Sequence, residues 1–287
     1  CLRSTLLHNL PLLTALIINP YRFAAGGITD PSDITGLALW FDASDSTTLS
    51  DTHTLGAGST PANGSEVKRW DDKAEILADY DFQQATTANA PIYRTAQING
   101  LDVIEFDGAT EWMVNNNNWH AIAPQTEGKT VFIVCEPQTG TGVSDGGSVM
   151  NLYDAENTGE AGLITCELAY RTNARTWVST DNCTTNQPNI ITLRQENQGV
   201  LVDNNLQTVV SMWLNGASVT NDVTSTDGLP VNQTASTPMV IGSNTNAASG
   251  LWFDGYICEI VMYDPPLSAT DRAAVEAYLA NKWGITI

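Results

Sequence analysis

The chain has 287 residues, enough for one large domain or two modest ones, and 42% of them are hydrophobic, an ordinary share for a globular protein. It carries 12 Lys and Arg against 32 Asp and Glu, a formal net charge of −20. Nucleic-acid binding depends on basic side chains that neutralise phosphates, so we exclude a nucleic-acid partner. The same acidity is repelled by anionic lipid, so we expect no membrane partner.

Residues 1–33 form an apolar segment that we expect to be a docking arm. A secretory signal would have an uninterrupted apolar core, but His8, Asn9 and Pro11 interrupt this one, and its unbroken stretch is too short to span a bilayer. An exposed apolar segment is costly in water, so another protein surface must cover it. The side chains expected to make that contact are Leu6, Leu7, Leu10, Leu12, Leu13, Ile17, Ile18, Tyr21 and Phe23.

From residue 34 to residue 287 the sequence predicts a single β domain that ends in a helix. Short runs rich in β-branched and aromatic residues are bounded by Gly, Pro, Asn, Asp or Ser, as in residues 36–43, 102–108, 129–137, 208–216 and 255–264. Within one such run Val131, Ile133 and Cys135 alternate with Phe132 and Val134, the period of a strand. Many short strands with turn signals between them favour a sandwich.

The last twenty residues change to a helical pattern. Ser268 followed three residues later by Asp271 is a helix start signal, and Asn281 or Gly284 is expected to end the helix. The helix is expected to lie across the sandwich with Trp283 as its anchor.

The motifs in order are GLALWFDASD (36–45), WDDK (70–73), PIYR with NGLDVIEFDG (91–108), GYICEIVMYDPPLS (255–268) and KWGI (282–285). This succession resembles the concanavalin A-like, laminin-G-like domains of bacterial and phage proteins over residues 35–287. The resemblance implies an all-β, concanavalin A-like β-sandwich (jelly roll) with an N-terminal extended arm and a short C-terminal helix. The segment INPYRFAA (18–25) resembles the start of tailed-phage structural proteins that mount such a domain on the particle.

The segment EFDGATE raises the possibility of a glycan hydrolase. Glu105, Asp107 and Glu111 come close to the E-x-D-x-x-E strand of retaining glucanases that share this fold, where alternate carboxylates reach into one cleft. The spacing here is one residue too long, and Gly108 indicates that the strand turns directly after Asp107, whose side chain suits a turn cap. We therefore expect no enzyme activity and keep hydrolysis as an alternative.

A structural calcium ion is a further possibility, since Ca²⁺ takes carboxylate and carbonyl oxygens. The candidate ligands are Asp42, Asp45 and Asp254; otherwise Asp42 and Asp45 would cap turns, and Asp71 and Asp72 would lie in solvent. No other cofactor is expected. The spacing of the five cysteines excludes a zinc pattern, and a Cys166–Cys183 disulfide remains open.

Trp112, Asn116 and Trp119 could form a glycan-contacting patch, because they combine aromatic rings with a polar loop. Together these features predict a non-catalytic structural protein of a tailed-phage virion, a capsid or tail decoration. It would be assembled in the host cytoplasm and exposed outside the cell, with other virion proteins and copies of itself as partners. The alternative is a carbohydrate-binding receptor-recognition module with a host-surface glycan as partner.

Overall fold

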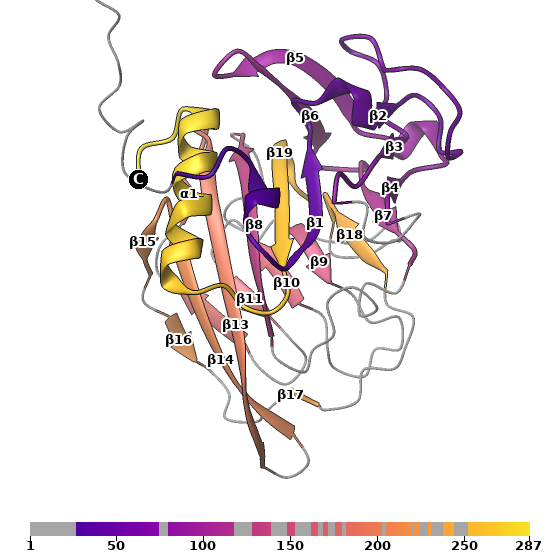
Figure 1. Ribbon diagram of the computed structural model, residues 1–287. Coiled ribbons are helices and arrows are strands. Elements are labelled where there is room, and N and C mark those ends of the chain that lie inside the picture. Colours follow the sequence, from indigo (N-terminus) through magenta and orange to yellow (C-terminus); the bar gives the residue numbers. More distant parts are fainter. Residues whose placement is uncertain are drawn as a thin grey trace, which may run out of the picture.

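The computed structural model describes residues 27–287 except 75–79, 118–127, 139–147, 153–161, 166–168, 172–175, 180–181, 203–204, 220, 224–228, 231–237 and 244–251. Two antiparallel β-sheets and one C-terminal helix make up the described structure (Figure 1). The predicted fold class, a β-sandwich closed by a short helix, is therefore confirmed. The predicted arm residues from Leu6 to Phe23 lie outside the described residues. No helix within the described part is both long and apolar enough to span a bilayer.

The first sheet has the order β15-β14-β13-β8-β19-β6-β5, with β1 paired to β19 and β17 paired to β14. Its strands are β1 (Leu37–Asp42), β5 (Ile92–Ile98), β6 (Leu101–Asp107), β8 (Gly128–Pro137), β13 (Asn189–Val202), β14 (Asn205–Leu214), β15 (Ala217–Ser218), β17 (Leu229–Pro230) and β19 (Asp254–Tyr263). On β19, Asp254–Ile257 pairs with β6 and Glu259–Tyr263 pairs with β1. Strand β19 thus joins the first motif of the sequence to the EFDG motif.

The second sheet has the order β16-β12-β11-β10-β9-β18-β7-β4-β3-β2. Its strands are β2 (Leu49–Ser50), β3 (Arg69–Trp70), β4 (Phe82–Gln83), β7 (Met113–Asn115), β9 (Ser148–Leu152), β10 (Gly162–Thr165), β11 (Ala169–Arg171), β12 (Thr176–Ser179), β16 (Asn221–Val223) and β18 (Met239–Ile241). Within the described residues, short 3₁₀ helices lie in the connections: η2 (Pro31–Asp33), η3 (Ser46–Thr48) and η4 (Thr87–Asn89).

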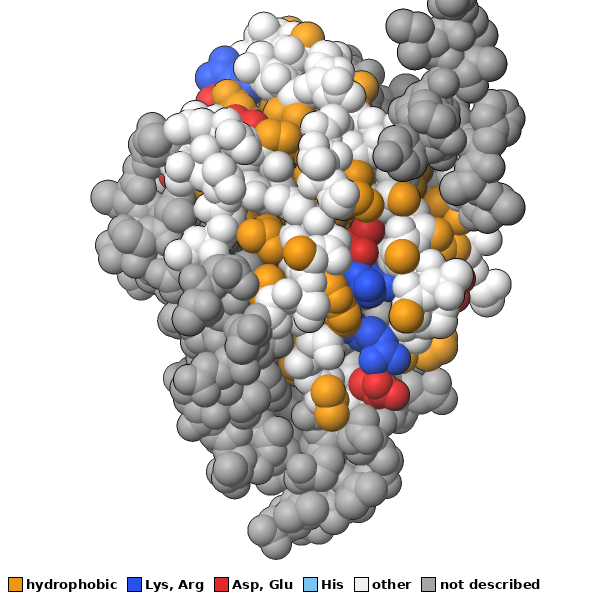
Figure 2. All heavy atoms as spheres, turned by 90° about the vertical axis from the view of Figure 1, so that its left-hand side faces the viewer, with side chains coloured by type: hydrophobic (Ala, Val, Ile, Leu, Met, Phe, Trp, Pro, Cys, Tyr) orange, Lys and Arg blue, Asp and Glu red, His pale blue; other side chains and the backbone are white. Residues whose placement is uncertain are grey.

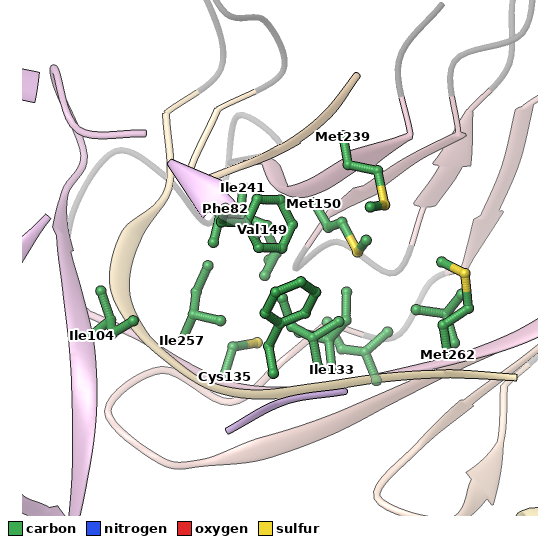
Figure 3. Close-up of a cluster of buried hydrophobic side chains, with 14 of the residues drawn as sticks. Phe82, Ile104, Ile133, Cys135, Val149, Met150, Met239, Ile241, Ile257 and Met262 are labelled. Carbon is green, nitrogen blue, oxygen red and sulfur yellow. The ribbon is translucent and has the colours of Figure 1, made fainter. Parts of the chain in front are cut away.

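The main hydrophobic core lies between the two sheets (Figure 3). The alternation predicted for β8 is confirmed, because Val131, Ile133 and Cys135 point into this core. Phe132 and Val134 join a second cluster on the opposite face of the same sheet, beneath α1. One strand of period two therefore supplies both cores.

The helix α1 (Ala269–Trp283) covers that opposite face (Figure 1). The Ser268 side chain accepts a hydrogen bond from the Asp271 N–H, and Gly284 ends the helix in the left-handed conformation at φ 72°, so the predicted start and the second of the two predicted ends are confirmed. Trp283 is buried, as expected for an anchor, together with Val275 and Leu279. Two hydrophobic layers thus hold the first sheet from both sides.

A buried carboxylate joins α1 to the sheet. Glu259 on β19 is 0% exposed. Its Oε1 accepts a hydrogen bond of 2.8 Å from the Trp40 indole, and its Oε2 accepts one of 2.7 Å from the Trp283 indole. The Lys282 ammonium lies 2.8 Å from Oε2. Burial raises the pKa of Glu259, and the nearby charge of Lys282 partly offsets that effect.

The same ionic network continues to the first loop of the sandwich. Lys282 Nζ also lies 2.7 Å from Asp42, and Lys73 Nζ lies 3.1 Å from Asp42 and 2.9 Å from Asp45. Burial alone would raise the pKa of Asp42, but the two lysines and the Ser44 hydroxyl hold it below its ordinary value. The Lys73 ammonium also lies 4.1 Å from the centre of the Trp40 ring. We call Trp40, Asp42, Asp45, Lys73, Glu259, Lys282 and Trp283 the buried network.

The expectation that Asp72 lies in solvent is wrong. Asp72 is buried, and its Oδ1 accepts hydrogen bonds from the backbone N–H groups of Trp40, at 2.7 Å, and Ala74, at 3.0 Å. Asp71, by contrast, forms an ion pair with Arg69. The WDDK motif therefore fixes strand β1 through Asp72 and the buried network through Lys73. A buried backbone N–H needs such an acceptor, which is why an aspartate is found in this interior.

Replacing Glu259 with Ala should lower the free energy of unfolding by about 3–5 kcal/mol, because it leaves two buried indole N–H groups without their acceptor and removes one of the two carboxylates that pair with Lys282. Urea denaturation measures the change. Glu196→Ala is the matched control, since Glu196 pairs with Arg194 but its side chain is 44% exposed, and it should cost about 0–1 kcal/mol. Equal costs for the two variants would contradict a structural role for the network.

Candidate functional site

A group of carboxyl side chains outside the buried network lies where β6 ends. Asp107 Oδ1 accepts hydrogen bonds from the N–H groups of Ala109 at 2.9 Å, Thr110 at 2.8 Å and Glu111 at 3.1 Å, and its Oδ2 accepts one from the Thr110 hydroxyl at 2.8 Å. Gly108 has a φ of 68°, so the strand turns there as the sequence predicted. The side chain of Asp107 is the cap of this turn.

Two other segments pack against the turn. The Gly108 N–H donates to the Phe253 carbonyl, and the Phe253 N–H donates to the Gly242 carbonyl, each at 3.0 Å. A Cβ added at Gly108 would lie 2.7 Å from Cβ of Asp254, and one added at Gly242 would lie 3.0 Å from the Glu111 carbonyl oxygen. The loops after β6 and β18 and the start of β19 therefore meet. We call this place, with Glu105, Asp107, Glu111, Trp112, Trp252 and Asp254, the acidic corner.

The carboxyls of the acidic corner differ in their protonation. Burial would raise the pKa of Asp107, but the N–H groups that it caps hold it below its ordinary value. Burial, reinforced by the charge of Asp107, raises the pKa of Glu111 to about 8. Burial, then the charges of Asp107 and Glu105, also raise the pKa of Asp254. One ionised carboxylate thus lies beside two carboxyl groups that hold their protons more tightly.

Glu105 and Glu111 differ in their contacts. Arg94 Nε on β5 donates to Glu105 Oε2, which forms an ion pair across neighbouring strands. Glu111 Oε2 is buried and has no hydrogen-bond partner in the part of the chain that the structure describes. A protonated acid close to an ionised carboxylate is the pattern of acid–base catalysis, but here the turn occupies Asp107 and Arg94 occupies Glu105.

Two partly exposed tryptophans border this corner. Trp112 follows Glu111 directly, and its backbone is held by Asn89 and by the side-chain amide of Gln84. Trp252 forms an isolated β-bridge with Ser243, next to Gly242. Aromatic rings beside carboxyl and hydroxyl groups are the usual lining of sites that hold polar organic ligands.

The predicted glycan patch and the predicted hydrolase residues fall partly here. The structure brings Glu105, Asp107 and Glu111 together, and it places Trp112 beside them and Asn116 on the exposed surface after β7. Trp119 lies outside the described residues, as does Cys166, while Cys183 is buried. The patch predicted from the sequence did not include Trp252. The sequence pattern that could have indicated Trp252 is a tryptophan directly after a polar segment.

The structure does not bring the three predicted calcium ligands together. Asp42 and Asp45 share Lys73, and Asp45 also accepts a hydrogen bond from Thr47 N at the start of η3, whereas Asp254 lies across from Asp107 at the other end of β19. Among the described residues no group of three His, Cys, Asp or Glu could hold a metal ion. The turn-capping roles expected otherwise for Asp42 and Asp45 are confirmed.

No family model matches the sequence, and no curated protein matches it. Among solved structures, domain 4 of AbnA, a GH43 extracellular arabinanase from Geobacillus stearothermophilus in complex with arabinotriose, is 13% identical, with a TM-score of 0.46 over 84% of this chain and 97% of that one. Trypanosoma rangeli sialidase in complex with 2,3-difluorosialic acid is 11% identical, with a TM-score of 0.49 over 88% of this chain.

The matched region spans 34% of that sialidase, about a third of its length. The CBM40 of Ruminococcus gnavus IT-sialidase, bound to alpha2,3 sialyllactose, is 15% identical, with a TM-score of 0.39 over 61% of this chain and 95% of that one. At identities and TM-scores this low, the matches carry no argument about function.

Glu111→Gln should become progressively more stable than the native chain as the pH rises from about 5 to about 8. The unfolded carboxyl ionises near its ordinary pKa of 4.5, while the folded one keeps its proton up to about 8, so the native chain loses stability across that window and the Gln variant does not. Urea denaturation at a series of pH values measures the difference. Glu196→Gln on β13 removes the same charge elsewhere and serves as the control; an unchanged difference between Glu111→Gln and the native chain would contradict a buried, protonated Glu111.

Proposed function

We propose that the chain is a non-catalytic structural protein of a tailed-phage virion, in which residues 1–33 dock it to the particle and the sandwich faces outward. One observation carries the non-catalytic part of this proposal: five charged motif residues, Asp42, Asp45, Lys73, Glu259 and Lys282, meet in the buried network, and the motif carboxylates Glu105 and Asp107 are held by Arg94 and by the turn after β6. Residues of that kind specify a fold and leave function to its loops and ends.

The arm supports the assembly role by its composition. Residues 1–29 contain Arg3 and Arg22 and no acidic residue, so all 32 Asp and Glu lie in the remainder of the chain. An apolar, slightly basic segment joined to an acidic domain is suited to contact another acidic protein surface. We take this composition as support for a decoration role, and we propose that the chain is assembled in the host cytoplasm and then exposed outside the cell.

The acidic corner supports a second role for the same domain, the binding of a glycan. Trp112 and Trp252 offer partly exposed rings, and Thr110, Glu111 and Asp254 offer polar groups beside them. Hydrolysis is the less favoured alternative, because Asp107 and Glu105 already have the partners described above.

Deletion of residues 1–27 should abolish incorporation into the particle and leave the cooperative unfolding of the sandwich intact, because the described members of both hydrophobic clusters all follow residue 27. Reconstitution of particles with the truncated chain, alongside its urea denaturation, tests this. Incorporation equal to that of the full chain would refute the docking role of the arm.

Trp112→Ala and Trp252→Ala should each lower affinity for a glycan ligand by about tenfold, since each removes one stacking ring. Binding is measured on a glycan array and then by calorimetry, and Trp213→Ala on β14 is the matched control with unchanged affinity. If the native chain hydrolyses a glycan of the array and Glu111→Gln abolishes that hydrolysis, the protein is a glycan hydrolase and the non-catalytic proposal is wrong.

A further inference from the structure

The most exposed positions of α1 carry no charged side chain, because the charged residues of the helix, Asp271, Arg272, Glu276 and Lys282, are half-buried or buried. The exposed residues of the helix and of the segments beside it include these small or uncharged ones: Ser268, Ala269, Thr270, Ala273, Ala277, Asn281, Gly284, Thr286 and Ile287. A helix on the surface of a soluble protein normally points charged side chains outward. In a chain with 32 acidic residues, exposed helix positions without charged side chains are unexpected.

The uncharged surface continues onto the neighbouring strands. Ile287, 54% exposed, lies against the turn between β14 and β15, where its Cβ would be 3.2 Å from a Cβ added at Gly216. Ala217 and Ser218 are exposed beside it, and Val209 on β14 is 48% exposed. We call the exposed residues of α1 together with Val209, Ala217, Ser218 and Ile287 the α1 face.

Several charged side chains on this side of the molecule have partners. Asp271 accepts a hydrogen bond of 2.8 Å from the Ser268 hydroxyl. Arg272 lies 4.1 Å from the centre of the Trp213 ring and forms an ion pair with Glu276, and Arg194 forms one with Glu196. Figure 2 shows this side of the molecule, where a short row of basic and acidic side chains lies among hydrophobic and uncharged ones. The exposed positions of α1 beside these charged side chains are uncharged.

The chain itself contains a segment that fits such a face. Residues 1–29 are rich in leucine and isoleucine, carry two arginines and lack acidic residues, so an acidic copy of the protein does not repel them. The described chain starts close to α1, because Ile28 packs on the hydrophobic cluster that contains Leu279 and Trp283. Residues 1–26 can extend up to about 85 Å, and α1 is about 22 Å long. The segment is therefore long enough to reach the α1 face of an adjacent copy.

We propose that residues 1–26 of one copy dock on the α1 face of a neighbouring copy. The inference rests on the proposed assembly role and names the surface that receives the arm. Two domains that each carry a large negative charge repel one another, so they approach most readily where exposed acidic side chains are few; beside the α1 face Glu196 is paired with Arg194. A contact between an arm and a different surface of the next copy is heterologous, and it generates a ring or a filament according to the rotation between copies.

The test is photo-crosslinking of the full chain with a benzoylphenylalanine in place of Leu13. Light and heavy-isotope preparations are mixed, so that a crosslink between a light and a heavy peptide identifies two different copies. The expected crosslinks join residue 13 of one copy to residues 268–287 or 209–218 of another. Ala273→Glu with Ala277→Glu should reduce their yield at least tenfold, because it adds two acidic side chains to the α1 face.

Ala85→Glu with Ala88→Glu is the matched control, since it adds the same charge at exposed positions in and before η4, and it should leave the yield unchanged. Sedimentation velocity measures self-association independently. Crosslinks confined to one copy, or mapped to another surface while the chain still self-associates, would overturn the docking inference and leave the assembly role standing. A chain that remains monomeric and reconstitutes into particles equally well without residues 1–27 would overturn both.

Discussion

The carboxylate of Glu259 is the point on which the architecture depends. It lies at the centre of the first sheet, yet it contacts β1 through the Trp40 indole and the end of α1 through Trp283 and Lys282. A buried carboxylate is stable only when its oxygens are satisfied, so strand β19, strand β1 and helix α1 must all be in place together. The network extends this requirement to Asp42 and Lys73, and hence to the loops that follow β1 and β3. The network thereby holds β1, from the first part of the domain, against β19 and α1 from its last part.

Local patterns of the sequence were sufficient for the elements but not for these contacts. The alternation in β8, the turn after Asp107 and the cap at Ser268 are each encoded within a few residues, and the structure has them as predicted. The hydrogen bond between Trp40 and Glu259 joins residues 219 apart. The periodicity of the sequence does not reveal such a long-range pair. Glu259 was therefore indistinguishable from any single polar residue in an apolar strand. For the same reason Asp72 was expected in solvent, although its acceptor role inside the fold requires burial.

The candidate site shows the same division between local and long-range information. That Asp107 would cap its turn could be inferred from Gly108 and from the chemistry of aspartate. The raised pKa of Glu111 could not be inferred from the sequence, because it arises from burial against segments that are distant in the sequence. Trp252 is held at the acidic corner by its bridge with Ser243 and by the hydrogen bonds of its neighbour Phe253 with Gly242 and Gly108. The chemistry of the corner is thus a property of the assembled loops, whereas the motifs of the resemblance specify the frame that holds them.

Hydrogen exchange of the two indole N–H groups in the native protein tests the central claim most directly. If Trp40 and Trp283 share Glu259 as their acceptor and the network closes only when the whole sandwich is formed, both indole protons should exchange with the opening free energy of global unfolding. The indole of the partly exposed Trp112 provides the comparison in the same spectrum. Exchange of the Trp40 or Trp283 proton as fast as that of Trp112 would contradict the claim that this carboxylate holds the fold together.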